Sequence, residues 1–64
     1  MKKLRFTNKK ENVTKECRMG QIGEMVFALV CNVKETNDAI RWCNTHKVGD
    51  VREHDDYIIE IMEG

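Results

Sequence analysis

The chain lacks the features that mark several specialised classes of protein. It contains no proline, and it has no low-complexity tract or internal repeat, which excludes repeat architectures. It also lacks net charge, because 11 basic residues balance 11 acidic ones. With 41% apolar residues and no excess charge, the composition predicts a folded chain rather than a disordered one. Its 64 residues have room for one domain, residues 1–64.

Long apolar runs are also missing. The longest, Met25–Cys31, is far shorter than the roughly 18 residues that indicate a membrane span. The basic start of the chain is followed by further charged residues rather than by the apolar core of a secretion signal. Three cysteines, Cys17, Cys31 and Cys43, cannot all pair with one another. These features predict a soluble cytoplasmic protein with free thiols and no membrane partner.

Short segments of alternating polarity predict a small sheet. Lys2–Thr7 and Val13–Arg18 form one expected hairpin, and Asp50–His54 and Tyr57–Met62 form a second. In the second strand of the first hairpin, Lys15 shares the face that would bury the apolar residues on either side of it.

One helix is predicted over Asn37–Lys47. Thr36 or Asn37 supplies its N-cap, Asp38 lies in the first turn, and Gly49 follows the last turn. The residues expected to face the core share one side of this helix: Ala39, Ile40 and Cys43.

The apolar segment Met25–Val33 fits both a helical stripe and a strand. Its β-branched and aromatic content, together with the flanking Gly23, favours a central strand. An extended segment here leaves little interior for a reaction chamber. The expected fold is therefore an α+β domain with one helix on a mostly antiparallel sheet of four to five short strands. The strand order stays open, and a βαβ crossover through the helix is an alternative.

The balanced net charge conceals an asymmetry along the chain. Residues 1–18 carry seven positive and two negative side chains, a sum of +5, whereas residues 19–64 carry four positive and nine negative, a sum of −5. The simplest explanation is that the two segments pair as neighbouring strands and neutralise each other. The functional alternative is that each segment presents its charge to a partner.

The acidic half predicts a non-catalytic protein-interaction module of the adaptor or stoichiometric-inhibitor type. Its carboxylates would occupy a basic groove on a protein partner, with a half-exposed tryptophan as an anchor. The predicted protein-binding residues are Trp42, Asp50, Glu53, Asp55, Asp56 and Glu60. Because so small a sheet has free edges, a homodimer is a further alternative.

The alternative function is that of a nucleic-acid-binding accessory protein, which would contact phosphates through the basic N-terminal segment. Its candidate residues are Lys3, Arg5, Lys9, Lys10, Lys15 and Arg18. Phe6 is the one aromatic residue among them, and the balanced overall charge is unlike that of a dedicated nucleic-acid binder.

The metal-ligand patterns are incomplete. Cys43 and His46 have the spacing of two zinc ligands on one helix face, and Cys17 and His54 would have to complete the site. A second closely spaced ligand pair is missing, so a buried thiol and a histidine near a helix C-terminus are the simpler interpretation.

Two further patterns also have a simple structural explanation. The acidic run His54-Asp55-Asp56 offers oxygen ligands for Mg²⁺ or Ca²⁺, but aspartates are common in turns for their own hydrogen bonding. A cysteine nucleophile has no evident base and orienting group. The sequence therefore predicts no enzyme, no cofactor and no metal site.

Overall fold

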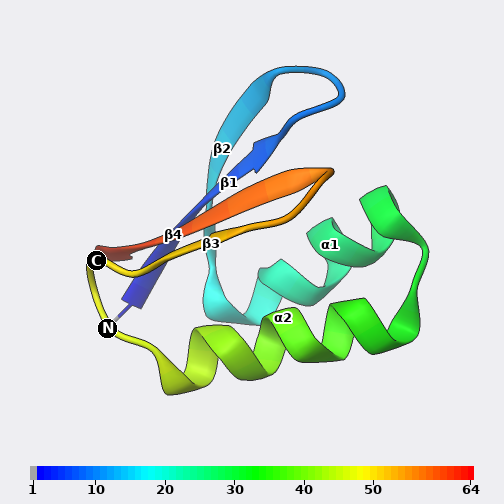
Figure 1. Cartoon of the computed structure of the whole chain (residues 1–64). Helices are drawn as coiled ribbons and strands as arrows, with labels where there is room; N and C mark the ends of the chain where they lie inside the picture. The colour runs from blue at the N-terminus through cyan, green and yellow to red at the C-terminus, as the bar shows by residue number, and fades with distance from the viewer. Residues whose placement is uncertain (1) are drawn as a thin grey trace.

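The computed structural model describes residues 2–64, which form two layers, a four-stranded antiparallel sheet and a pair of helices (Figure 1). The elements in chain order are β1 (Lys2–Asn8), β2 (Val13–Arg18), a 3₁₀ turn η1 (Met19–Gln21), α1 (Ile22–Val30), α2 (Val33–Thr45), β3 (Val51–Glu53) and β4 (Tyr57–Glu63). The predicted α+β class is confirmed, as are both hairpins, whereas the expectation of a single helix is wrong.

The strand order is β2-β1-β4-β3, and every neighbouring pair is antiparallel. The first and last strands of the chain therefore lie side by side at the centre of the sheet (Figure 1). β2 and β3 are its edges, and the alternative of a βαβ crossover does not occur.

The prediction of a strand over Met25–Val33 is wrong, because this segment contributes most of α1 and the first residue of α2. The physical reason is that the inner face of the sheet has to be covered. This face carries several large apolar side chains, among them Tyr57, which a covering layer must bury. Two helices cover it, with Ile22 and Val26 of α1 fully buried one turn apart. Tertiary burial therefore outweighs β propensity.

The start of α2 also differs from the prediction of an N-cap at Thr36 or Asn37. The cap is Asn32, whose side chain accepts a hydrogen bond from the backbone N–H of Glu35 at 3.0 Å. Only two residues, Cys31 and Asn32, separate the helices, and Cys31 turns the chain with a left-handed φ of 52°. The helix ends at Thr45, two residues before the predicted end.

The core lies between the sheet and the helix pair. Its buried apolar side chains are Leu4, Phe6, Cys17, Ile22, Val26, Ala39, Cys43, Tyr57, Ile59 and Ile61. Ala39 and Cys43 occupy the inner side of α2 as predicted, while Ile40 lies at its margin, 2.9 Å from the point where a Cβ on Gly23 would lie. The small Gly23 thus lets the two helices approach. Neither helix has the length and apolar character that crossing a bilayer requires.

Candidate functional site

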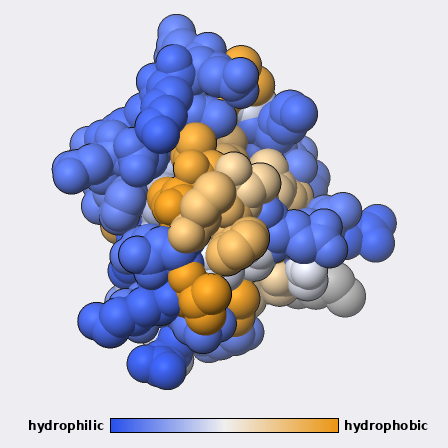
Figure 2. All heavy atoms as spheres, turned by 90° about the vertical axis from the view of Figure 1, so that its right-hand side faces the viewer, coloured by the Kyte–Doolittle hydropathy of each residue, from blue (hydrophilic) through white to orange (hydrophobic). Residues whose placement is uncertain are grey.

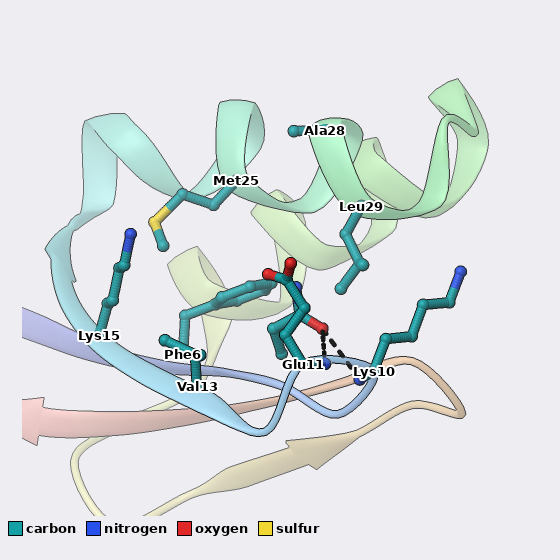
Figure 3. Close-up of a pocket in the computed structure, with 9 residues that line it drawn as sticks. Phe6, Lys10, Glu11, Val13, Lys15, Met25, Ala28 and Leu29 are labelled. Carbon is teal, nitrogen blue, oxygen red and sulfur yellow. Dashed lines mark hydrogen bonds between the residues drawn. The ribbon is translucent and has the colours of Figure 1, made fainter.

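A groove of about 550 Å³ lies between the β1–β2 hairpin and α1 (Figure 3). Ile22 and Val26 turn the buried side of α1 toward the sheet, which leaves Met25 and Leu29 on a neighbouring flank. That flank faces the hairpin, where Phe6 forms part of the opposite wall. The groove thus has apolar walls contributed by a strand pair and a helix.

Charged side chains stand at the mouth of this groove. Lys15 and Lys10 lie at opposite ends, with Glu11 between them (Figure 3). The side-chain carbonyl of Asn8 accepts hydrogen bonds from the backbone N–H groups of Lys10 at 2.9 Å and Glu11 at 3.1 Å, so the hairpin turn is internally fixed. Lys10 also lies 4.0 Å from Asp56, so Lys15 is the lysine of this rim that makes no ion pair within residues 2–64.

Apolar side chains are also exposed at the surface. Figure 2 shows apolar atoms gathered at the centre of one face and surrounded by hydrophilic ones. Val13, which lines the groove, is 42% exposed, whereas Phe27, 46% exposed on α1, does not line it. Such exposure costs solvation free energy in a free monomer, and clustered exposure is typical of a contact surface.

The predicted acidic surface is largely neutralised within the chain. Glu60 lies 3.3 Å from Arg5 on the adjacent strand, and Glu53 lies 2.8 Å from Lys9. Asp56 is 4.0 Å from Lys10. The interpretation that the basic and acidic segments pair as neighbours in the sheet is therefore confirmed.

The remaining predicted protein-binding residues are dispersed. The carboxylate of Asp50 accepts the backbone N–H of Lys47 at 3.1 Å, as in a local turn. Asp55 is exposed in the β3–β4 turn. Trp42 is half-buried at the edge of the core and stacks on His46, with 4.6 Å between the ring centroids.

The basic residues of the nucleic-acid hypothesis do not line one surface. Lys3 pairs with Glu16 at 3.1 Å, and Arg5 and Lys9 pair with acids of the second hairpin. Lys10 and Lys15 line the groove. Within residues 2–64, the Lys15 side chain makes no ion pair, and neither does that of Arg18.

A polar cluster that the sequence did not reveal joins α2 to the β3–β4 hairpin. Glu35 accepts a hydrogen bond from the hydroxyl of Tyr57 and another, at 3.0 Å, from Arg52. His54 lies 4.0 Å from the same carboxylate and stacks on Tyr57 at 4.7 Å between ring centroids. The pattern Asn32-x-x-Glu35 was the one local signal, because it is typical of a helix start.

These contacts change the ionisation of the cluster. Burial alone would raise the pKa of Glu35, but hydrogen bonds from Tyr57 and Arg52 and the charges of Arg52 and His54 outweigh it and lower that pKa. Burial raises the pKa of Tyr57 to about 12. The cluster therefore holds a carboxylate, a guanidinium and a neutral phenol, which suits a structural tie between the layers.

The cysteine and histidine residues do not assemble. Cys43 is fully buried, and burial, with a smaller contribution from Cys17, raises its pKa to about 11. His46 is exposed, with its Nδ1 at 2.9 Å from the carbonyl oxygen of Trp42. Across the described part of the chain, no three of the His, Cys, Asp and Glu side chains come together as ligands for a metal ion.

Comparison with known proteins adds no relationship to these observations: no family model, curated protein or solved structure matches this chain.

Proposed function

We propose that this chain is a non-catalytic protein-interaction module and that the groove between the β1–β2 hairpin and α1 is its main contact surface. The observation that carries the proposal is the apolar lining of this groove, where Met25 and Leu29 are only half-buried and Val13 is 42% exposed. A domain of this size has few apolar side chains to bury, so leaving several at an open groove needs a compensating role.

The acidic β3–β4 hairpin is a second candidate contact surface. Asp55 is exposed, and the side chain of Glu53 is 69% exposed despite its pairing with Lys9. Because Asp56 and Glu60 also lie against cations of the same chain, less negative charge is available here than the sequence suggests. This surface therefore ranks below the groove as the site of partner binding.

Nucleic-acid binding is the alternative function, supported by Lys15 and Arg18, the two of its candidate residues that make no ion pair within residues 2–64. Retention on heparin that falls steeply with salt, and that is lost in Lys15→Glu with Arg18→Glu, would favour it. Elution at low salt that these substitutions leave unchanged would contradict nucleic-acid binding.

Partner capture from the native host, followed by reconstitution with the purified partner, tests the proposed function. We expect Leu29→Asp to abolish capture, because it places a carboxylate on the apolar wall of the groove. Lys15→Glu, at an exposed position, tests the same groove with little effect on folding. Asn37→Asp is the matched control, since it adds a carboxylate to an exposed position of α2 away from the groove.

Capture that survives both groove substitutions but fails in Asp55→Lys would transfer the function to the acidic hairpin. Circular dichroism of each variant separates loss of binding from loss of fold. A partner that binds all variants equally would contradict both contact surfaces.

A further inference from the structure

The groove lies beside a sheet edge. β2 pairs with β1 on one side only, and no other strand of residues 2–64 lies beyond it. Alternate backbone groups of an edge strand point away from the sheet and are available to pair with another chain.

Two contacts show which groups of β2 point outward. The backbone N–H of Arg18 donates to the side-chain oxygen of Gln21 at 3.0 Å, and therefore points away from β1. The hydroxyls of Thr7 and Thr14 lie 3.0 Å apart, as suits the closely spaced pairs of an antiparallel ladder that share no backbone hydrogen bonds. By alternation, Thr14 and Glu16 present their N–H and C=O groups outward together with Arg18.

The same edge borders the apolar groove. The inward-facing residues of β2, Val13 and Lys15, line the groove opposite Met25 and Leu29 of α1. A strand added beside β2 would turn every second side chain toward this flank of α1. Main-chain hydrogen bonds and apolar side-chain pockets, the two components of strand addition, are therefore adjacent here.

Charge at the groove selects the occupant. Lys15 at one end makes no ion pair within residues 2–64, and Lys10 at the other end keeps 60% of its side chain exposed although it lies 4.0 Å from Asp56. With Glu11 between these lysines, the groove favours a segment with carboxylates at its ends and apolar side chains in its middle.

A second copy of β2 fits poorly. Two copies of β2 could pair antiparallel over most of the strand with both helix layers on the same side of the joined sheet. In each such register, either Lys15 or Glu16 would lie opposite its own copy. Like charges directly opposite each other destabilise a strand pair.

We propose that an extended segment of a partner protein, apolar at alternate central positions and acidic at both ends, adds as a fifth strand along β2 and fills the groove with its inward side chains. This inference rests on the proposed function and specifies the partner and its mode of binding. The outward groups of Thr14 and Glu16 supply the main-chain hydrogen bonds, and Lys10 and Lys15 pair with the terminal carboxylates.

The probe is a short blocked peptide with aspartate at each end and valine or isoleucine at alternate positions separated by threonine. Two peptides are its controls: one with lysine in place of aspartate, and one that is N-methylated at the residues facing β2. We expect saturable binding by calorimetry, and hydrogen-exchange protection of the Thr14 and Glu16 amides. N-methylation and the aspartate-to-lysine change should each weaken binding about tenfold or more.

A matched pair of variants tests the backbone directly. Glu16→Pro removes an outward N–H without removing a hydrogen bond to β1, because the Glu16 amide points away from β1. Glu16→Ala keeps that N–H and loses only the pair with Lys3. We expect the proline variant to bind the peptide about tenfold more weakly than the alanine variant, with circular dichroism confirming that both are folded.

Equal binding of the N-methylated peptide, or equal binding by the two Glu16 variants, would overturn strand addition. The proposed function would then still stand if partner capture depends on Leu29 and Lys15. Failure of every peptide to bind, or a concentration-dependent dimer seen by sedimentation without peptide, would also overturn the proposal. Failure of the proposed function itself would appear separately, as partner capture that the Leu29 and Lys15 substitutions leave unchanged.

Discussion

The guanidinium of Arg52, on the edge strand β3, lies 3.0 Å from the carboxylate of Glu35 in the first turn of α2. Both side chains are mostly buried, with 24% and 20% of their surface exposed. Tyr57 donates its hydroxyl to the same carboxylate from the neighbouring strand β4. This contact fixes the start of α2 against a strand of only three residues, so we expect it to be the main polar tie between the two layers.

Replacing this carboxylate tests the tie. Glu35→Gln keeps the shape of the side chain but leaves the partly buried guanidinium of Arg52 without its counter-ion, so the free energy of unfolding should fall by about 1–3 kcal/mol. Chemical denaturation followed by circular dichroism measures the loss. Asp38→Asn is the control on the same helix, because its carboxylate is 4.0 Å from the exposed Arg41, and its effect should stay within about 0.5 kcal/mol. Equal effects of the two substitutions would contradict the assigned role.

The same carboxylate makes stability depend on pH. Its pKa is lowered in the folded state, where Tyr57, Arg52 and His54 face it, so its stabilising contribution is fully present above the ordinary glutamate pKa of about 4.3. The contribution is lost as the pH falls through the lower, folded-state pKa. The difference in unfolding free energy between the native chain and Glu35→Gln should therefore be fully present at about pH 5 and shrink below about pH 4.

Urea titrations of both proteins across this range make the measurement. Glu53, whose pKa is lowered by its contact with Lys9, is present in both chains, and its titration cancels in the difference. A difference that grows on acidification would show that Glu35 gains no stability from its ionised form.

The two hairpins could be predicted from sequence because their signal is local. In β1 the apolar Leu4 and Phe6 alternate with polar residues. In β4 the alternate positions Tyr57, Ile59 and Ile61 are apolar, and the structure places them on the buried face. Neutralisation between the basic and acidic segments could be predicted from the distribution of charge along the chain, because oppositely charged neighbours stabilise a sheet.

The helix pair could not be read from periodicity, because α1 is apolar around most of its circumference. A cap signal, Asn32 three residues before Glu35, was present, but no glycine or proline marks the break at Cys31. The groove could not be predicted either, since one of its walls is α1 and this segment was expected to be a strand. Lys15 was the available hint, as a charged residue on the inward face of a strand suits an open groove better than a closed core.

The junction between the helices offers a stabilising substitution. Cys31 adopts φ 52°, a left-handed conformation that costs a residue with a Cβ about 1–2 kcal/mol, and glycine does not bear this cost. Cys31→Gly should raise the free energy of unfolding by about 0.5–1 kcal/mol after the greater freedom of glycine in the unfolded chain is subtracted. Cys31→Ala controls for loss of the thiol and should change little, whereas Cys31→Val should destabilise. Urea denaturation ranks the variants, and a glycine variant no more stable than the alanine variant would contradict the assigned backbone strain.

Thiol accessibility tests the placement of all three cysteines at once. Cys31 is exposed, whereas Cys17 and Cys43 are buried, and burial raises the pKa of both buried thiols. Because the thiolate is the reactive form, a disulfide reagent at neutral pH should modify one thiol rapidly in the native chain and the other two only on unfolding. Cys31→Gly should remove the fast phase and leave the slow one. Rapid modification of all three native thiols would mean that the interior opens readily, and the helix pair would then not be the stable wall that the groove requires.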